Sequence, residues 1–440
     1  MTADAKDFYL MTDLDKFEYM WIDRAQIPDR TFQKYGLDNL QTSSKGMYMV
    51  RVKKGMYGLP HAGRIAAIKV TALLAQAGYR ECRHNKMVFR HDTRNVTFTL
   101  VVDDFLVKYS ERADAEHLIK TLETVYVMKT DWDAKKYLGI SLEWDYVSNP
   151  RSVALSMPNY VDKGVQRFAQ WLGPLRKTAH GPGLPAPRIY GVQPAKELVI
   201  SPELPADEKK ELQRLVGYFR YYAESIDCTQ LVKLGQLASQ QNKPTEATKR
   251  EAAAFLDYVA TWPNATLTYR ASDMVLRTIS DGSHRGEPFG GCRIGGIHFL
   301  GAADCSDING ALLVVCRLLD VQSSSACETE LGALYENARA IAGLRTLLDE
   351  LGYTQTRPTE VECDNKCAVG IACETEKHKR AAAMDMRFLW VADRVRQGQI
   401  HVRWSAGQGN LADYVTKIHP HKHHRDMRKF FVSDPVLAMR

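Results

Sequence analysis

The sequence predicts an α/β fold, because short strand patterns and amphipathic helical patterns follow one another along most of the chain. Residues 95–110, NVTFTLVVDDFLVKYS, contain two apolar β runs that meet at an acidic pair, with helical spacing before them (63–79) and after them (111–126). From residue 265 onward, the strand patterns TLTYR, VLRTISDGS and GCRIGGIHFLGA precede a long helical pattern over 328–351 and the short strand TEVECD.

Length and composition are those of an ordinary globular protein with several domains. The 440 residues correspond to roughly two to four domains. Apolar residues make up 45% and charged residues 25%, which excludes a disordered, collagen-like or coiled-coil main body. No run approaches the roughly 18 apolar residues of a membrane span, and the N-terminus lacks the pattern of a secretory signal. We therefore expect a cytoplasmic or nuclear protein with no membrane partner.

Charge and cysteine usage narrow the choice of partner and compartment. The net charge of +7 is compatible with nucleic acid as a partner, and the stretch 377–403 predicts one basic face, with seven Lys or Arg against two Asp. The nine cysteines are scattered and include no C-x-x-C pair, so a reducing compartment fits better than a disulfide framework or a zinc site.

Punctuation along the chain predicts three regions: 1–172, 173–264 and 265–440. Residues 173–206 are rich in Pro and Gly and are typical of a linker over a domain surface. The stretch 207–260 is helical in pattern, and Thr245 is placed as an N-cap. The basic pattern over 377–397 predicts a further helix, which the strand QIHVRW follows.

Four acidic residues in the last region occupy positions that suit a metal site: Asp281, Glu330, Asp364 and Asp413. Asp281 follows a β run, Glu330 lies near the start of the long helix, and Asp364 ends the strand VEC. Strand ends and helix starts meet at one edge of an α/β sheet. Hard cations prefer such oxygen ligands, and two of them about 3.5–4 Å apart can clamp the oxygens of a phosphodiester. Any one of these acids could instead be a helix cap or a turn residue.

The order of these motifs resembles the RNase H fold. SDGSHRGEPFGG followed by IGGIHF resembles its first strand-turn-strand, ETELGAL its helix glutamate, VECDN its fourth-strand aspartate, and NLADYVTK its last aspartate in the copia-type retrotransposon version. The resemblance implies a mixed sheet with flanking helices. It also implies hydrolysis of RNA in RNA/DNA hybrids with two Mg²⁺ or Mn²⁺ ions per site. The loop before the last aspartate, WSAGQGN, lacks the histidine that these enzymes usually carry, and the nearest earlier one is His401.

The VVDD turn in turn resembles the paired aspartates of reverse transcriptases. DAKDFYL resembles the first palm strand, KKGMYGLPHAGR a template- and nucleotide-contacting stretch, and LSMPNYVDKGVQRF the start of the thumb. The resemblance thus extends over nearly the whole chain, as a copia-type Pol with an α+β palm-like domain, a helical connection and an RNase H-like domain. It implies Asp4, Asp103 and Asp104 as metal ligands of a second two-metal site.

The same resemblance implies contacts with primer-template nucleic acid and dNTP. Tyr9 takes the place of the ring that excludes ribonucleotides, or else is a core aromatic. The template stretch contributes the run Gly58, Leu59, Pro60 and His61, in which His61 stands where the family has Gln, and Val101 replaces an aromatic residue. Because Met1 lies three residues before Asp4, we expect the fingers to be missing, which makes DNA synthesis by this chain doubtful.

Two further features complete the sequence-based expectations. Basic residues of the 377–403 stretch are candidates for contacts with the phosphates of a hybrid: Lys377, Lys379, Arg380, Arg394 and Arg396. HPHKHH (419–424) favours a solvated C-terminal loop over a chelating site. The leading function is therefore a retrotransposon fragment that cleaves hybrids, in contact with other polyprotein products. The alternative is an inert or co-opted protein that binds nucleic acid.

Overall fold

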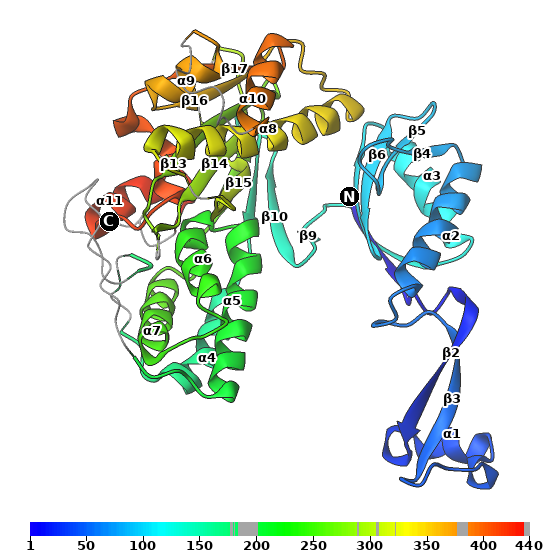
Figure 1. The fold of residues 1–440 in the computed structure, drawn as a ribbon. Coiled ribbons are helices and arrows are strands. Elements are labelled where there is room, and N and C mark those ends of the chain that lie inside the picture. The colour runs from blue at the N-terminus through cyan, green and yellow to red at the C-terminus, as the bar shows by residue number, and fades with distance from the viewer. Residues whose placement is uncertain are drawn as a thin grey trace. The chain divides into compact units, whose positions relative to one another are not determined.

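The computed structural model describes residues 1–176, 179, 181–183, 201–287, 290–304, 308–321, 323–375 and 386–434. The chain divides into two compact units, Met1–Leu138 and Gly139–Arg440 (Figure 1). Each unit has a hydrophobic core of its own, and the second unit has two such clusters. Among the described residues, no helix combines the length and apolar character needed to cross a bilayer.

The first unit is built on an antiparallel six-stranded sheet in the order β4-β5-β6-β7-β1-β8. These strands are β1 (Thr2–Lys6), β4 (Tyr79–Glu81), β5 (Val88–His91), β6 (Val96–Val101), β7 (Asp104–Tyr109) and β8 (Val127–Asp131). The helices α2 (Ala62–Gln76) and α3 (Arg112–Glu123) bury Val70, Leu74, Leu118 and Leu122 in its core. The predicted hairpin and both neighbouring helices are therefore present.

A long hairpin extends the first unit between β1 and α2. Strands β2 (Asp13–Asp23) and β3 (Met47–Lys54) pair antiparallel and enclose the short helix α1 (Asp29–Lys34). Their side chains are mostly exposed, including Phe17, Tyr19 and Trp21. The sequence does not predict this hairpin, because exposed strands show little of the period-two alternation of apolar residues that identifies a strand.

The second unit begins with three antiparallel strands and four helices. The strands are β10 (Ile140–Asp145), β11 (Ser152–Ser156) and β12 (Leu267–Arg270). The helices are α4 (Tyr160–Leu172), α5 (Ala206–Ser225), α6 (Leu231–Ser239) and α7 (Glu246–Thr261). Thr245 caps α7 as predicted. Its hydroxyl accepts a hydrogen bond from the Thr248 N–H, and the Thr248 hydroxyl accepts one from the Thr245 N–H. Much of the predicted linker 173–206 lies outside the described residues.

A mixed five-stranded sheet forms the rest of the second unit, in the order β15-β14-β13-β16-β17. Its strands are β13 (Val275–Ser283), β14 (Arg293–Gly301), β15 (Ala311–Leu318), β16 (Thr359–Cys363) and β17 (Ile400–Trp404). The first three are antiparallel, whereas β16 runs parallel to both β13 and β17. This mixture of helices and mixed sheets confirms the predicted α/β class.

Helices and short turns cover both faces of this sheet. The helix α8 (Ala326–Glu350) lies across β13 and β14, with α9 (Lys366–Ala372) and α10 (Met386–Arg396) beside it (Figure 1). The helical spacing predicts a buried stripe of Leu331, Leu334, Ala338, Ile341 and Leu344, of which the first four are buried there and Leu344 is half-buried. On the other face, Ile279, Ile297 and Phe299 join a core shared with α4–α7 and the 3₁₀ turn η7 (Leu411–Val415).

The C-terminal histidine segment differs from its prediction. Residues His421–Arg428 form the helix α11, and His419 and His424 are buried rather than solvated. The reason is aromatic packing: Tyr414 stacks on both His419 and His424 at ring-centroid distances of 5.6 and 5.2 Å. The expectation of a solvated loop is therefore wrong.

Candidate active site

The acids predicted for the C-terminal region meet in the second unit. Asp281, Glu330 and Asp364 each offer a carboxylate oxygen, and these oxygens lie within 4.8 Å of one another. Asp281 and Glu330 are buried, and Asp364 is half-buried. Asp413 is also buried, and its charge acts on both Asp281 and Asp364. Three of the four predicted acids thus form one tight group, and the fourth lies beside it.

The fold explains why residues so distant in sequence meet. Strands β13 and β16 are parallel, with Ile279 opposite Glu362, and this register continued by two places sets Asp281 opposite Asp364. Glu330 comes from the first turns of α8, whose backbone packs against β13. Asp413 belongs to η7, which contacts β13 and β14 from the other face. Strand ends and a helix start therefore converge as the sequence predicted.

Two glycines permit the close approach on which the group depends. A Cβ at Gly282 would lie 3.0 Å from the Thr329 carbonyl and 3.1 Å from the Glu330 nitrogen, so a larger residue would separate β13 from α8. A Cβ at Gly407 would lie 2.5 Å from Asp364 Oδ2. The carboxyl of Asp364 thus leaves room only for glycine at position 407 of the WSAGQGN loop.

The electrostatics of the group are those of crowded, buried carboxyls. Burial and the neighbouring Asp413 raise the pKa of Asp281 to about 7. Burial, together with Asp281 and Asp364, raises the pKa of Glu330 well above its ordinary value, while burial and Asp413 raise that of Asp364. Like charges this close in a protein interior cannot all ionise without a compensating cation. The group therefore retains protons at neutral pH unless a cation replaces them.

Three residues that the sequence analysis did not single out hold the acids in place. Lys417 Nζ pairs with Asp413, and the charges of Asp413 and Asp281 raise the lysine pKa despite its burial. Thr416 Oγ1 donates to Asp281 Oδ2 at 2.7 Å, and Asn410 Nδ2 donates to the Ser280 carbonyl at 3.1 Å. All three flank Asp413 within the motif NLADYVTK, yet spacing alone does not say which side chains turn inward.

The histidine that lies beside the acidic group is His419, not the His401 that precedes the last aspartate in the sequence. His401 is exposed and contacts Glu360 at 2.8 Å, on β17. His419 instead is buried, with Nε2 3.1 Å from the Asp413 carbonyl oxygen and 3.8 Å from its Oδ2. Burial lowers the pKa of His419 to about 4, so its ring is neutral at physiological pH. This histidine packs beside the last aspartate from the C-terminal side, in the segment 419–424.

The acids predicted in the first unit lie close to one another on adjacent strands. Asp4 on β1 stands opposite Asp104 on β7, and Asp103 precedes Asp104 in the turn after β6, where Val102 has a φ of +60°. Burial, then Asp103 and Asp4, raise the pKa of Asp104. Among the described residues, these three do not form a group as tight as that of the second unit.

The stretch KKGMYGLPHAGR (53–64) adds a residue that sequence reasoning missed. Tyr57 donates its hydroxyl to Asp103 Oδ2 at 3.1 Å, and the Tyr9 ring packs edge-on against it at 4.8 Å. His61 precedes α2 and lies 3.8 Å from Glu18. Gly58 adopts a φ of +93°, which favours glycine, while Leu59 is half-buried and Pro60 exposed. The only sequence feature that could have indicated Tyr57 is its position inside the motif KKGMYGLPHAGR.

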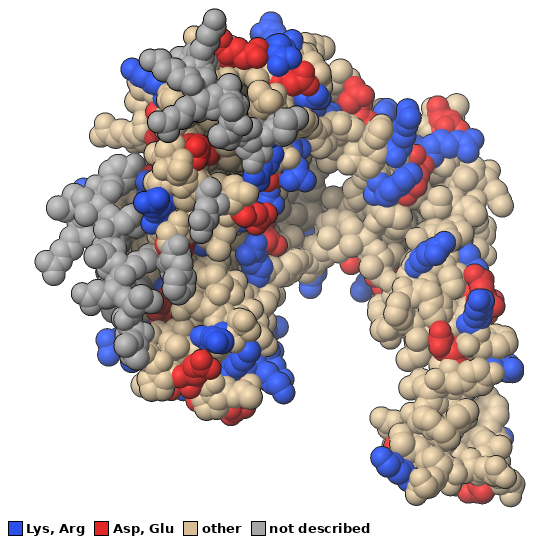
Figure 2. Space-filling view, viewed as in Figure 1, with Lys and Arg blue, Asp and Glu red and all other residues tan. Residues whose placement is uncertain are grey.

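The basic residues proposed for the phosphate backbone are only partly described. Lys377, Lys379 and Arg380 lie outside the described residues. Arg394 pairs with Asp393 at 2.6 Å, and Arg396 pairs with Glu374 at 2.9 Å. Figure 2 shows Lys and Arg interspersed with Asp and Glu over the visible face. Their contact with nucleic acid stays a prediction.

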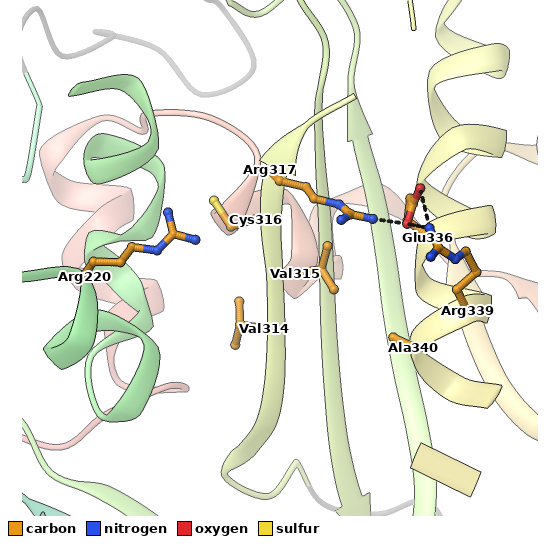
Figure 3. A pocket seen from close by; sticks show the side chains of 8 residues that line it. All are labelled: Arg220, Val314, Val315, Cys316, Arg317, Glu336, Arg339 and Ala340. Atoms are coloured by element: carbon orange, nitrogen blue, oxygen red, sulfur yellow. Dashed lines mark hydrogen bonds and ion pairs between the residues drawn. The ribbon is translucent and has the colours of Figure 1, made fainter. Parts of the chain in front are cut away.

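A separate hollow of about 400 Å³ lies between α5, β15 and α8 (Figure 3). Arg220, Arg317 and Arg339 line it, but each is paired: Arg220 with Glu224 at 2.6 Å, and the other two with Glu336. None of the four acids is among its lining residues. The hollow is therefore distinct from the acidic group and offers no unpaired arginine to an anion.

Comparison with known proteins gives clear relatives in sequence. No protein-family model matches the chain. It is 22% identical over 431 residues to the retrovirus-related Pol polyprotein from transposon TNT 1-94 of Nicotiana tabacum, a match that covers 95% of this chain and 29% of the relative. It is 23% identical to the corresponding polyprotein from transposon RE2 of Arabidopsis thaliana, over 84% of this chain and 24% of the relative. The chain thus spans about a quarter of the length of these relatives.

Among solved structures, the chain is similar to an RNase H1 isolated from compost by a metagenomic approach. The match covers 32% of this chain and 93% of that one at 19% identity, with a TM-score of 0.25. The fold of the second unit is therefore described from its own strand order, β15-β14-β13-β16-β17. The motifs of the whole chain agree with the sequence matches, which cover 84–95% of its length. The chain is similar to the retrovirus-related Pol polyproteins of copia-type transposons.

Proposed function

We propose that the C-terminal region, residues 265–440, carries a cation-dependent ribonuclease site that hydrolyses the RNA strand of RNA/DNA hybrids, as part of a retrotransposon Pol product. One observation carries the proposal: the buried group Asp281, Glu330 and Asp364, with oxygens within 4.8 Å, and Asp413 beside it. The order of the motifs and the similarity to Pol polyproteins support the choice of substrate.

The donor set fits hard divalent cations. Four carboxyls offer oxygen ligands and no soft donor, which suits Mg²⁺ or Mn²⁺. Burial, and after it the neighbouring acids, raise the pKa values of Asp281, Glu330 and Asp364, and bound cations would offset the negative charge of the ionised carboxyls. When bound, the two ions would activate a water and stabilise the charge that develops on the phosphodiester.

The surrounding side chains would keep the ligands in position. Thr416 restrains Asp281 through a 2.7 Å hydrogen bond, and the Gly282 N–H donates to the Glu330 carboxyl. Lys417 offsets part of the negative charge beside Asp413. Such supporting contacts typically matter 10–100-fold for metal affinity or activity.

Hybrid cleavage by the full chain tests this proposal. The substrate is an RNA/DNA hybrid labelled on the RNA strand, in Mg²⁺ and separately in Mn²⁺. Asp281→Asn should abolish cleavage, whereas Asp320→Asn, the same change at an exposed position, should leave it unchanged. Cleavage that survives Asp281→Asn would refute the assignment of this site.

DNA synthesis is a second candidate function, favoured by one observation: Asp4 and Asp104 are paired across β1 and β7, with Asp103 adjacent. These acids would hold two divalent ions, with primer-template and dNTP as substrates, and Tyr9 would lie near the incoming sugar. The test is primer extension on an RNA template. Extension that Asp103→Asn abolishes and Asp15→Asn preserves would support polymerase activity, and no extension by the folded chain would refute it for this chain alone.

The alternative from another class is a protein that binds hybrids without cutting them. It predicts hybrid binding by the wild-type chain with no cleavage in either metal. The same cleavage assay, run beside a binding assay, separates the two accounts. We also propose that the chain acts in the cytoplasm or the nucleus, and that other polyprotein products are among its partners.

A further inference from the structure

Two cysteines from different helices lie in sulfur contact beside the acidic group. Cys327 Sγ and Cys367 Sγ are 3.1 Å apart, although 40 residues separate them in the sequence. Both are free thiols. Cys327 is the second residue of α8, and Cys367 is the second residue of α9.

Their positions connect the pair to two of the candidate ligands. Cys327 precedes Glu330 by three residues, so both lie on one side of the first turns of α8. Cys367 follows Asp364 by three residues, with Asn365 as the N-cap of α9 in between. A covalent bond between the two sulfurs would therefore tie together the segments that carry Glu330 and Asp364.

Accessibility distinguishes this pair from the other described cysteines. Cys367 is exposed and Cys327 is half-buried, whereas a further five are buried: Cys82, Cys228, Cys292, Cys316 and Cys363. Cys373 is half-buried, and its Sγ lies 3.4 Å from the Val402 carbonyl oxygen. Within the described residues, Cys327 and Cys367 thus combine access to solvent with a neighbouring thiol.

We propose that Cys327 and Cys367 form a reversible disulfide on exposure to a peroxide, and that this bond regulates the adjacent acidic group. The thiol of Cys367 attacks the peroxide, the O–O bond breaks, and water and a sulfenic acid form. The sulfur of Cys327 then attacks the Cys367 sulfur, the S–S bond forms, and a second water leaves. In total, two thiols are oxidised to a disulfide and one hydrogen peroxide is reduced to two waters.

The order of attack follows from the surroundings of each sulfur. Cys367 is the exposed member and meets the peroxide first. Burial, with the neighbouring Cys367, raises the pKa of Cys327 to about 12, so this thiol stays protonated at neutral pH and does not itself attack the peroxide. A cellular dithiol reverses the reaction by exchange, in agreement with the reducing compartment that the cysteine pattern indicates.

The regulatory part rests on the proposed metal site. A disulfide has its sulfurs about 2.05 Å apart, so the two sulfurs must approach by about 1 Å, which pulls on the helix starts that carry them. Glu330 and Asp364 then shift relative to each other, and metal–ligand distances in cation sites lie within about 0.2 Å of their preferred values. Oxidation is expected to weaken Mn²⁺ binding about tenfold, the lower end of what disturbing a supporting contact costs.

The first test identifies the bond without any activity measurement. The reduced full chain is treated with hydrogen peroxide, the remaining thiols are alkylated, and a non-reducing digest is analysed by mass spectrometry. A cross-linked pair of peptides containing Cys327 and Cys367 is expected, and dithiothreitol should remove it. Cys373→Ser should still form the pair, and Cys367→Ser should not. Alkylated Cys327 and Cys367 after peroxide treatment, or pairing with other cysteines, would overturn the proposal.

The second test measures Mn²⁺ affinity by calorimetry for the reduced and the oxidised chain. About tenfold weaker binding after oxidation, restored by dithiothreitol and missing in Cys367→Ser, would support regulation. A cross-linked chain with unchanged affinity would overturn regulation. A chain that binds no Mn²⁺ in either state would instead contradict the proposed function, and the mass measurement would still decide the disulfide.

Discussion

Asp281 shows how burial and charge crowding act on a single residue. Its pKa is raised to about 7, mainly by burial and then by Asp413. Between the ordinary value of 3.8 and about 7, the folded state binds more protons than the unfolded state, so this residue's contribution to stability falls as the pH rises through that range. At pH 8 without metal, Asp281 therefore destabilises the fold.

Asp281→Asn should stabilise the metal-free chain at pH 8. Removing the buried charge is expected to raise the free energy of unfolding by on the order of 1–3 kcal/mol more at pH 8 than at pH 5. Urea unfolding at the two pH values measures the difference. A variant that is equally destabilised at both would contradict the pKa assignment.

Gly407→Ala should disturb the acidic group without unfolding the chain. The new methyl group would lie 2.5 Å from Asp364 Oδ2, so the carboxyl must move. We expect at least about tenfold weaker Mn²⁺ binding by calorimetry. Gly409→Ala, two residues further on, meets nothing within 4 Å and serves as the matched control. Equal losses of Mn²⁺ affinity in the two variants would show that a general disturbance of the loop, and not displacement of Asp364, weakens binding.

At this scale the sequence predicted the acids but not the side chains that support them. Asp281, Glu330 and Asp364 could be found because motif order and strand ends place them at one edge. Lys417, Thr416 and Tyr57 were missed because a one-dimensional pattern does not record which neighbours turn toward a carboxyl. The buried His419 was likewise assigned to a solvated segment, because its partner Tyr414 is visible only in three dimensions.

Among the elements, α11 is held by a buried ion-pair network. Arg428 donates to both oxygens of Asp227 at 2.9 Å and to Asp434 at 2.7 and 2.9 Å, and all three side chains are almost fully buried. The Tyr258 hydroxyl of α7 lies 2.9 Å from the same guanidinium. The network thus joins α11 to η3 (Cys228–Gln230) and α7, which form part of the same core as η7.

Arg428→Leu should destabilise the chain strongly. Removing the guanidinium leaves Asp227 and Asp434 buried without a counter-charge, which typically costs about 3–5 kcal/mol. Arg425→Leu changes an exposed residue of the same helix and should alter stability by less than about 0.5 kcal/mol. Thermal unfolding of both variants is the measurement. Similar melting temperatures for the two would contradict the role of the network.

The elements that were predicted and those that were missed differ in pattern strength. The hairpin β6–β7, the helix α8 with its buried stripe and the Thr245 cap all followed from clear periodicity or capping chemistry. Strand β15 was missed because ALLVVCRL is a continuous apolar run without alternation, and α9 because its seven residues are too few to establish a helical period. The hairpin β2–β3 is too exposed to show a buried face.

For the whole molecule, similarity is extensive although identity is low. The chain matches a Pol polyprotein over 95% of its length at 22% identity. The quoted motifs surround the acids of both units. The division of the chain into regions 1–172, 173–264 and 265–440 stays a proposal, which limited proteolysis can check.

Cation binding by the whole chain should depend on pH in a defined direction. Because the pKa values of the group are raised, protons compete with cations, and metal affinity should increase as the pH rises through about 7. Added Mn²⁺ should therefore raise the melting temperature more at pH 8 than at pH 6. Asp281→Asn should reduce this difference. An equal shift at both pH values would contradict the account of the group.

We infer that the buried carboxyls form a hybrid-cleaving site, and the choice of RNA substrate tests this claim. The full chain is incubated in Mn²⁺ with the same RNA sequence presented as an RNA/DNA hybrid, an RNA duplex and a single strand. We predict cleavage of the hybrid alone, abolished by Asp281→Asn and retained by Asp320→Asn. A folded chain that binds the hybrid in Mn²⁺ and leaves it intact would contradict the claim.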